Sequence, residues 1–117
     1  MNTTEVGAFA EQIAADYLER EGYNILDRNY RYKRLGEIDI VARFNGTIIF
    51  VEVRYRTSTV YGTPEESLRP GKIRKVRRTA LMWLTVHGCH HLPCRCDVIA
   101  VDLVGGEPVV RHLVDAF

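Results

Sequence analysis

Hydrophobic residues near the N-terminus recur with the period of a helix. The apolar positions are Val6, Phe9, Ala10, Ile13, Tyr17 and Leu18. Spacings of three and four residues place these side chains on one face of an α-helix, and we expect that face to be buried. Thr3 or Thr4 can cap the helix, and Gly22 suits its end after about Glu21.

Three strand-like segments follow this helix. Residues 23–32 are predicted as a first strand, and residues 34–36 as a turn. Residues 37–44 and 47–55 are predicted as a hairpin, because Asn45-Gly46 between them favours a two-residue turn.

The hairpin turn also predicts which residues face each other. With Asn45-Gly46 as the loop, Phe44 faces Thr47, and the same register brings Asp39 opposite Glu52. The face carrying Asp39 also carries Val41, Ile48 and Phe50, and the other face carries Ile38, Ile40, Ala42, Ile49, Val51 and Val53. Because both faces are largely apolar, we expect the sheet to be covered on both sides.

A second helix is predicted after a loop that contains Gly62 and Pro64. Pro70 suits the first helical position, and the helix should end near His87. Its expected buried stripe consists of Ile73, Val76, Ala80, Trp83 and Leu84.

Two more strands complete the pattern. Residues 97–103 are predicted as a buried strand and residues 109–113 as a short final strand. The order is therefore αβββαββ, an α/β arrangement that we expect to form a single domain over residues 1–117.

Composition places the chain among ordinary globular proteins. Hydrophobic residues make up 46% of it and charged residues 26%, which argues against a disordered or repetitive chain. The three cysteines cannot all pair internally, and the sequence has no apolar stretch long enough for a membrane span. We therefore expect a reduced, cytoplasmic protein without a membrane partner.

The net charge of +1 hides an uneven distribution. Basic residues cluster without any acid at Arg69, Lys72, Arg74, Lys75, Arg77 and Arg78, and again at Arg28, Arg31, Lys33 and Arg34. In the second helix, Lys72, Lys75 and Arg78 follow one another three residues apart along one ridge. This ridge is predicted to contact a nucleic-acid backbone, and the alternative is a solvated helix face.

Two opposed carboxylates are the main candidate for chemistry. Like charges at directly paired positions repel, so Asp39 and Glu52 need a shared proton or a divalent cation such as Mg²⁺ (or Mn²⁺) between them. The cation fits better, since Arg54 on the same face can hold a phosphate. The alternative is a polar sheet edge closed by ion pairs with Arg54, with Arg43 or with a basic residue on a helix.

Three further positions carry weaker signals. Glu11 borders the apolar stripe of the first helix and is either a third ligand or an ordinary solvated glutamate. Asp97 is expected to pair with an arginine rather than to join the site. A cluster of histidines and cysteines suggests a possible zinc site: His87, Cys89, His90, His91, Cys94 and Cys96. Because the cluster has no C-x-x-C spacing, we predict a connecting loop without a metal instead.

A set of residues spread over nearly the whole length of the chain matches a known family: Gly7, Ala10-Glu11, Ala14, Leu18, Gly22-Tyr23, Asn29, Gly36-Glu37-Ile38-Asp39-Ile40 and Phe50-Val51-Glu52-Val53-Arg54-Tyr55-Arg56. Through these residues the sequence resembles the YraN family of small bacterial proteins. That family is similar to the PD-(D/E)XK nucleases, in particular to archaeal Holliday-junction resolvases. The resemblance implies a restriction-endonuclease-like core, with a mixed five-stranded sheet flanked by helices.

The resemblance also implies roles for individual residues. Glu11, Asp39 and Glu52 would bind divalent metal and orient the attacking water, and Lys72 would contact substrate phosphate. Arg54 stands where the motif has lysine, and Ile38 where it often has proline. An arginine can clamp phosphate but cannot accept a proton, so this replacement bears directly on activity.

Three hypotheses follow. The first is a Mg²⁺-dependent endonuclease that hydrolyses branched or structured DNA, for which a homodimer would suit a two-fold substrate. The second is a non-catalytic nucleic-acid-binding module that keeps the fold and the basic surface. The third is a partner-binding scaffold in which the carboxylates are only structural charges.

Overall fold

Helices and strands follow one another in the predicted order αβββαββ. The computed structural model describes residues 1–59, 63–64 and 68–117, so the loop expected around Gly62 lies partly outside the described residues. The elements are α1 (Thr3–Arg20), β1 (Asn24–Tyr32), β2 (Gly36–Phe44), β3 (Thr47–Arg56), α2 (Pro70–Val86), β4 (Cys94–Asp102) and β5 (Val109–Leu113).

The starts of two elements differ from the prediction, whereas the other ends agree with it to within one residue. The side chain that caps α1 is that of Asn2, which accepts a hydrogen bond from the backbone N–H of Glu5 at 2.9 Å, rather than that of Thr3 or Thr4. Strand β4 begins at Cys94, three residues before the predicted start at Asp97, because its first residues pair with the beginning of β3. That pairing depends on a distant segment, so the local pattern of β4 did not show it.

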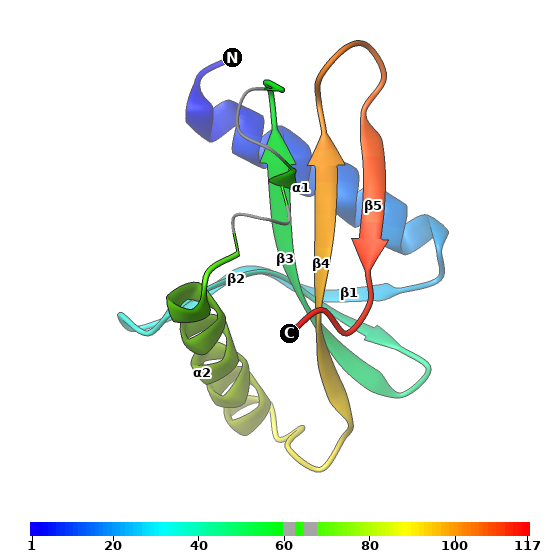
Figure 1. The fold of residues 1–117 in the computed structure, drawn as a ribbon. Coiled ribbons are helices and arrows are strands. Elements are labelled where there is room, and N and C mark those ends of the chain that lie inside the picture. The colour runs from blue at the N-terminus through cyan, green and yellow to red at the C-terminus, as the bar shows by residue number, and fades with distance from the viewer. Residues whose placement is uncertain (60–62, 65–67) are drawn as a thin grey trace.

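The five strands form one mixed sheet in the order β1-β2-β3-β4-β5 (Figure 1). The central pair, β3 and β4, is parallel, and the other three pairs are antiparallel. A parallel pair needs a crossover connection, and α2 lies within it. The predicted α/β class with a mixed five-stranded sheet is confirmed.

Both faces of the sheet are covered, as the hairpin pattern predicted. On one face Ile49, Val51 and Val53 of β3 pack in a cluster with Ala10, Ala14 and Leu18 of α1. On the other face Ile48 and Phe50 pack in a cluster with Val76, Ala80 and Trp83 of α2. The side chains of β3 alternate between two cores, so polar residues in this strand are also drawn into the interior.

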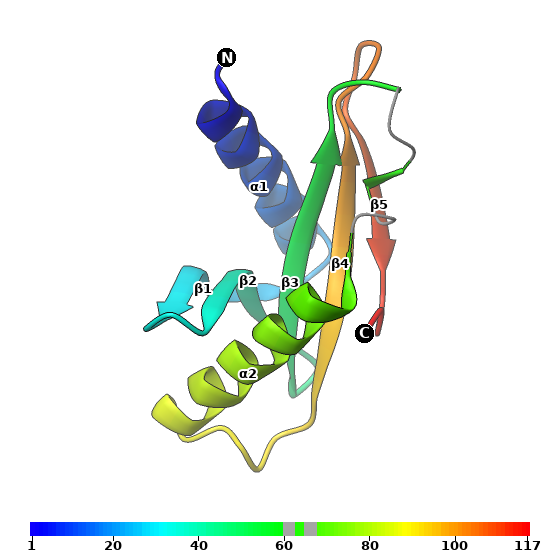
Figure 2. The same cartoon turned by 60° about the vertical axis from the view of Figure 1, so that its left-hand side comes forward.

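The β2–β3 hairpin has the predicted register only over part of its length. Pairing runs from Phe44↔Thr47 at the turn to Ile40↔Val51, which is one step short of Asp39 and Glu52. Strand β2 stays paired with β1 out to Gly36. Figure 2 shows the β1–β2 hairpin turned away from β3 and β4, between α1 and α2.

The bend in β2 also changes the face of one apolar residue. Ile38 was predicted to lie with Ile40, but it packs in the α2-side cluster with Val41 and Phe50, whereas Ile40 packs on the α1 side. Regular alternation is therefore broken at Asp39, where the strand leaves its partner. None of the helices in the described part of the chain is long and apolar enough to span a membrane.

Candidate active site

The two predicted carboxylates lie where β2 and β3 separate. In place of a backbone partner, Oδ2 of Asp39 accepts a hydrogen bond from the backbone N–H of Val53 at 2.8 Å. Glu52 is the residue before Val53, so the side chain of Asp39 is held beside the segment that carries the second acid. The predicted Cα pairing of Asp39 with Glu52 is absent from the ladder, but the two side chains are close enough to interact electrostatically.

Glu52 is almost completely buried, with 3% of its surface exposed. Its Oε1 lies 3.6 Å from Nζ of Lys72 and 3.7 Å from Nε of Arg54. These separations allow attraction between charges but exceed hydrogen-bond distance. Among the described residues, Oε2 of Glu52 and Nε of Arg54 are buried without a hydrogen-bond partner.

The protonation of the acid pair reflects this burial. Burial and, to a lesser extent, the negative charge of Asp39 raise the pKa of Glu52 to about 7, against the opposing charges of Lys72 and Arg54. Burial likewise raises the pKa of Asp39, against the hydrogen bond from Val53 and the attraction of Lys72. Lys72 and Arg54 therefore do not fully offset the burial and mutual repulsion of two ionised carboxylates, which is the situation that a bound cation relieves.

Glu11 lies on α1, close enough to Asp39 for the two charges to interact. It is half-buried, and its pKa is raised by burial and by the charges of Asp39 and Glu37. Within the described residues, however, no three His, Cys, Asp or Glu side chains are arranged so that they could hold a metal ion. The structure thus brings Glu11 near the pair without making it a ready third ligand.

Asn29 joins the site although sequence reasoning did not single it out as a functional residue. It lies between Arg28 and Tyr30, which pair with Ile40 and Ile38, so it stands across from Asp39. Its side chain lies close enough to Glu11 to oppose the rise in the pKa of that acid, and its backbone is left-handed, with φ 51°. An asparagine inside a strand is unfavourable, and that is the signal that could have revealed it.

The predicted substrate-binding residues separate into two groups. Pro70 begins α2, and this start directs Lys72 toward Glu52, where the lysine is half-buried. Lys75 and Arg78 lie further along the helix and are exposed. Lys72 therefore belongs to the carboxylate site, while the other two belong to the adjoining surface.

The residues present fit a hard divalent cation. Mg²⁺ prefers carboxylate oxygens and is held in proteins by one or two carboxylates, with the remaining positions filled by water or phosphate. The unpartnered Oε2 of Glu52 and the neighbouring carboxylate of Asp39 supply such a donor set. Lys72 and Arg54 add positive charge that suits an anionic substrate rather than a second metal.

Asp97 has a different role, as predicted. It is fully buried and pairs with Arg95 at 3.0 Å and with Nε2 of His112 at 2.7 Å. It also accepts a hydrogen bond from the backbone N–H of Asp115 at 2.9 Å, so it ties β4 to β5 and to the C-terminal segment. The His/Cys residues at 87–96 belong to no group of potential metal ligands among the described residues.

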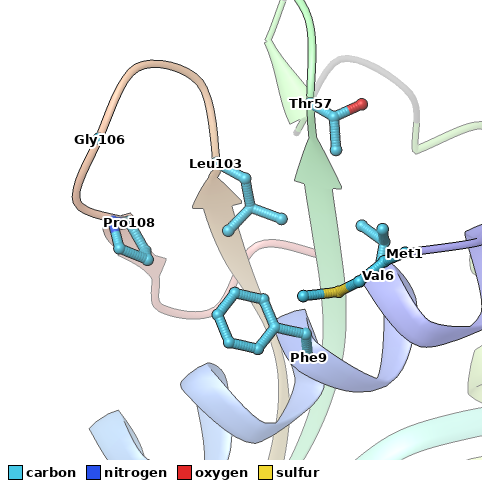
Figure 3. A pocket seen from close by; sticks show the side chains of 7 residues that line it. All are labelled: Met1, Val6, Phe9, Thr57, Leu103, Gly106 and Pro108. Atoms are coloured by element: carbon cyan, nitrogen blue, oxygen red, sulfur yellow. The ribbon is translucent and has the colours of Figure 1, made fainter.

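An apolar hollow of about 340 Å³ lies between α1 and the loop that joins β4 to β5 (Figure 3). It is lined by Met1, Val6, Phe9, Thr57, Leu103, Gly106 and Pro108. The lining has no acidic or basic side chain, and its only side-chain hydroxyl is that of Thr57, so the hollow does not compete with the carboxylate pair as a candidate active site.

Together, the fold and the site define a small mixed α/β protein with a buried carboxylate pair flanked by two cations. The chain belongs to the family described as "Uncharacterised protein family UPF0102", whose model matches residues 10–101. That segment contains Glu11, Asp39, Glu52, Arg54 and Lys72. Membership agrees with the YraN-like resemblance of the sequence.

Similar proteins carry the same family name. The chain is 49% identical to a UPF0102 protein of Lachnoclostridium phytofermentans over 118 aligned residues, covering 100% of this chain and 98% of the relative. It is 46% identical to one of Trichlorobacter lovleyi, covering 96% and 89%. It is 43% identical to UPF0102 protein GSU0650 of Geobacter sulfurreducens, covering 96% and 88%.

Proposed function

We propose that this protein is a metal-dependent nuclease with a restriction-endonuclease-like core that hydrolyses phosphodiester bonds in DNA. The observation that carries the proposal is the state of Glu52: it is buried, beside a second acid, with one oxygen facing two cations and the other without a partner. A purely structural ion pair would be expected to satisfy both oxygens.

Asp39 and Glu52 would hold Mg²⁺ (or Mn²⁺), and Glu11 on α1 would add a third carboxylate to the metal site. When bound, the ion would polarise the phosphate and lower the pKa of a water molecule. The hydrogen bond from Val53 holds one oxygen of Asp39, which leaves its other oxygen for the metal.

The two cations divide the remaining work. Arg54 is the phosphate clamp, because a guanidinium binds two phosphate oxygens at once but stays protonated. Nζ of Lys72 lies 3.6 Å from Oε1 of Glu52. It therefore places beside the acid pair an amine that can exchange protons, which the guanidinium of Arg54 cannot do. We propose that Lys72 orients the attacking water, so that the lysine missing from β3 is replaced from α2.

A cleavage assay tests this function. The assay compares four proteins on junction, flap and linear duplex DNA in Mg²⁺ or Mn²⁺: wild type, Asp39→Asn, Glu52→Gln and Glu107→Gln. The last variant is the control, because Glu107 is an exposed loop residue. We expect cleavage by wild type and the control, and at least about 100-fold less by the two site variants, since even outer-shell changes at metal sites cost 10–100-fold. Equal cleavage by wild type and Glu52→Gln, or none by wild type on all three substrates, would refute it.

A non-catalytic nucleic-acid-binding module is the second candidate. The exposed basic residues of α2 favour it, because Lys75 and Arg78 form no ion pair within the described part of the chain. It predicts salt-dependent DNA binding that is unchanged in Glu52→Gln and is never followed by cleavage.

A further inference from the structure

A second group of basic side chains lies at the tip of the β1–β2 hairpin. Arg31, Lys33 and Arg34 are exposed there and line a hollow of about 320 Å³ together with Gly36 and Glu37. Arg31 is paired with Glu37 at 2.9 Å. Neither Lys33 nor Arg34 forms an ion pair with any acid among residues 1–59, 63–64 and 68–117, so the tip carries uncompensated positive charge.

The hairpin tip is packed directly on α2. A Cβ placed at Gly36 would lie 3.0 Å from Oγ1 of Thr79 and 3.2 Å from Cβ of Lys75. A Cβ at this position would force Thr79 or Lys75 to move by a few tenths of an ångström, and Gly36 also has a positive φ of 154°. The backbone of the tip therefore lies against the helix at Lys75.

This contact joins two basic segments that are far apart in the sequence. Lys33 and Arg34 precede Gly36, while Lys75 and Arg78 lie on the helix ridge that Gly36 contacts. One turn earlier on the same ridge, Lys72 reaches Glu52. We call Lys33, Arg34, Lys75 and Arg78 the basic surface, and Lys72 connects it to the carboxylate pair.

We infer that the basic surface binds the phosphodiester backbone of double-stranded DNA and leads one strand to the carboxylate pair. The inference rests on the proposed nuclease function and adds the hairpin tip as a second substrate contact. Phosphate contacts position a duplex without reading its bases, and exposed Lys and Arg side chains provide them.

The aromatic residue at the tip favours a duplex over a single strand. Proteins that hold single strands stack the bases on exposed aromatic rings. Tyr32 is half-buried, and the ammonium of Lys33 lies over its ring at 5.4 Å from the centroid. The ring is thereby covered, so the tip offers charge rather than a stacking platform.

Fluorescence anisotropy in EDTA tests the inference without any catalysis. Labelled duplex DNA is titrated with wild type, Lys33→Glu/Arg34→Glu and the control Arg43→Glu, which reverses an exposed charge near the opposite end of β2. We expect roughly tenfold or greater loss of affinity for the double variant, and a salt dependence of log K smaller by about 2. The control should stay within about twofold of wild type.

Circular dichroism establishes that each variant is folded. The binding test is then repeated with Lys33→Ala/Arg34→Ala, which removes the two charges without reversing them. Unchanged affinity in both double variants, or an equal loss in Arg43→Glu, would overturn the inference. Wild-type affinity for an unstructured single strand that equals or exceeds that for the duplex would also overturn it.

Failure of the inference is distinguishable from failure of the proposed function. Metal-dependent cleavage that requires Glu52 but is indifferent to Lys33 and Arg34 would refute the basic surface alone. Tight duplex binding that depends on Lys33 and Arg34, with no cleavage in Mg²⁺ or Mn²⁺, would refute the nuclease and support the surface as a binding site.

Discussion

The backbone N–H of Val53 donates a hydrogen bond to Oδ2 of Asp39 at 2.8 Å, just beyond the last paired residues of β2 and β3. An acid side chain thus takes the place of a strand partner where the two strands separate. This bond sets the direction of one carboxylate, while the adjacent Glu52 is held by burial between two cations. The opening of the ladder is therefore what gives both acids access to one site.

Replacing Arg54 by lysine should preserve folding and at least retain metal-dependent cleavage. Arg54→Lys keeps the positive charge near Oε1 of Glu52 and adds an amine that can exchange protons. Lys72→Ala, in contrast, should reduce cleavage by roughly 100-fold, as removal of a positioned polar group does in other active sites. Single-turnover rates on duplex DNA provide the measurement, and undiminished cleavage by Lys72→Ala would contradict the role given to that lysine.

The buried acid predicts a pH-dependent stability in metal-free buffer. The folded-state pKa of Glu52, about 7, exceeds the ordinary value of 4.5, so the folded protein binds more protons than the unfolded chain between these pH values. Its contribution to stability is present below pH 4.5 and is lost as the pH rises through 7. Glu52→Gln should remove this loss, which is on the order of 3 kcal/mol.

Urea unfolding of wild type and Glu52→Gln in EDTA at pH 5 and pH 8 measures the effect. The gain in stability from the substitution should be larger at pH 8 than at pH 5. Taking the difference between the two proteins cancels the titration of the histidines, which both share. An equal difference at the two pH values would show that Glu52 does not titrate in this range.

Divalent metal should stabilise the folded protein through the same acids. Binding to the folded state alone adds about 2.7 kcal/mol when the free metal is 100 times its Kd, which amounts to a rise in Tm of several degrees for a chain of this size. Thermal unfolding with and without Mn²⁺ should show this rise for wild type and for Glu107→Gln. If Asp39→Asn or Glu52→Gln shows the same rise, the metal binds elsewhere.

Removing Asp97 should destabilise the fold without touching the carboxylate pair. Burial raises the pKa of Asp97, but hydrogen bonds from His112, Arg95 and the backbone of Asp115 outweigh it and lower the pKa overall. Asp97→Ala removes the acid that pairs with Arg95 and His112, which keep only their contacts with Tyr23 and Tyr17, and it should cost about 3–5 kcal/mol. Denaturant unfolding measures the cost, and a loss below about 1 kcal/mol would be too small for a buried network of this kind.

A methyl group at Gly36 should separate the hairpin tip from α2. Gly36→Ala places a Cβ 3.0 Å from Oγ1 of Thr79 at a φ that alanine rarely adopts, and we expect a loss of about 1–3 kcal/mol. Gly46→Ala is the matched control, because Gly46 also has a positive φ, of 79°, but has no atom within 4 Å of the added Cβ. Equal losses in the two variants, measured by urea unfolding, would assign the whole effect to backbone strain.

Much of the fold could be read from local patterns. Helical spacing in residues 3–20, Pro70 at the start of α2 and Asn45-Gly46 at the hairpin turn led to the correct order of elements and to the correct register at the turn. Each of these signals lies within a few residues of the feature that it predicts. Asp39 and Glu52 were found in the same way, because the turn determines which residues of β2 and β3 can meet.

Tertiary structure decided how these acids are held. Whether β2 stays with β3 or bends toward α2 depends on the packing of Ile38 and Gly36 against distant residues, and that packing ends the ladder before Asp39. It likewise recruits Asn29 to Glu11 and brings Lys72 to Glu52. The sequence by itself determined the elements and the candidate acids, because these follow from local spacing. The burial of the acids, their charge partners and the basic surface depend on contacts between segments far apart in the chain, and local spacing does not encode such contacts.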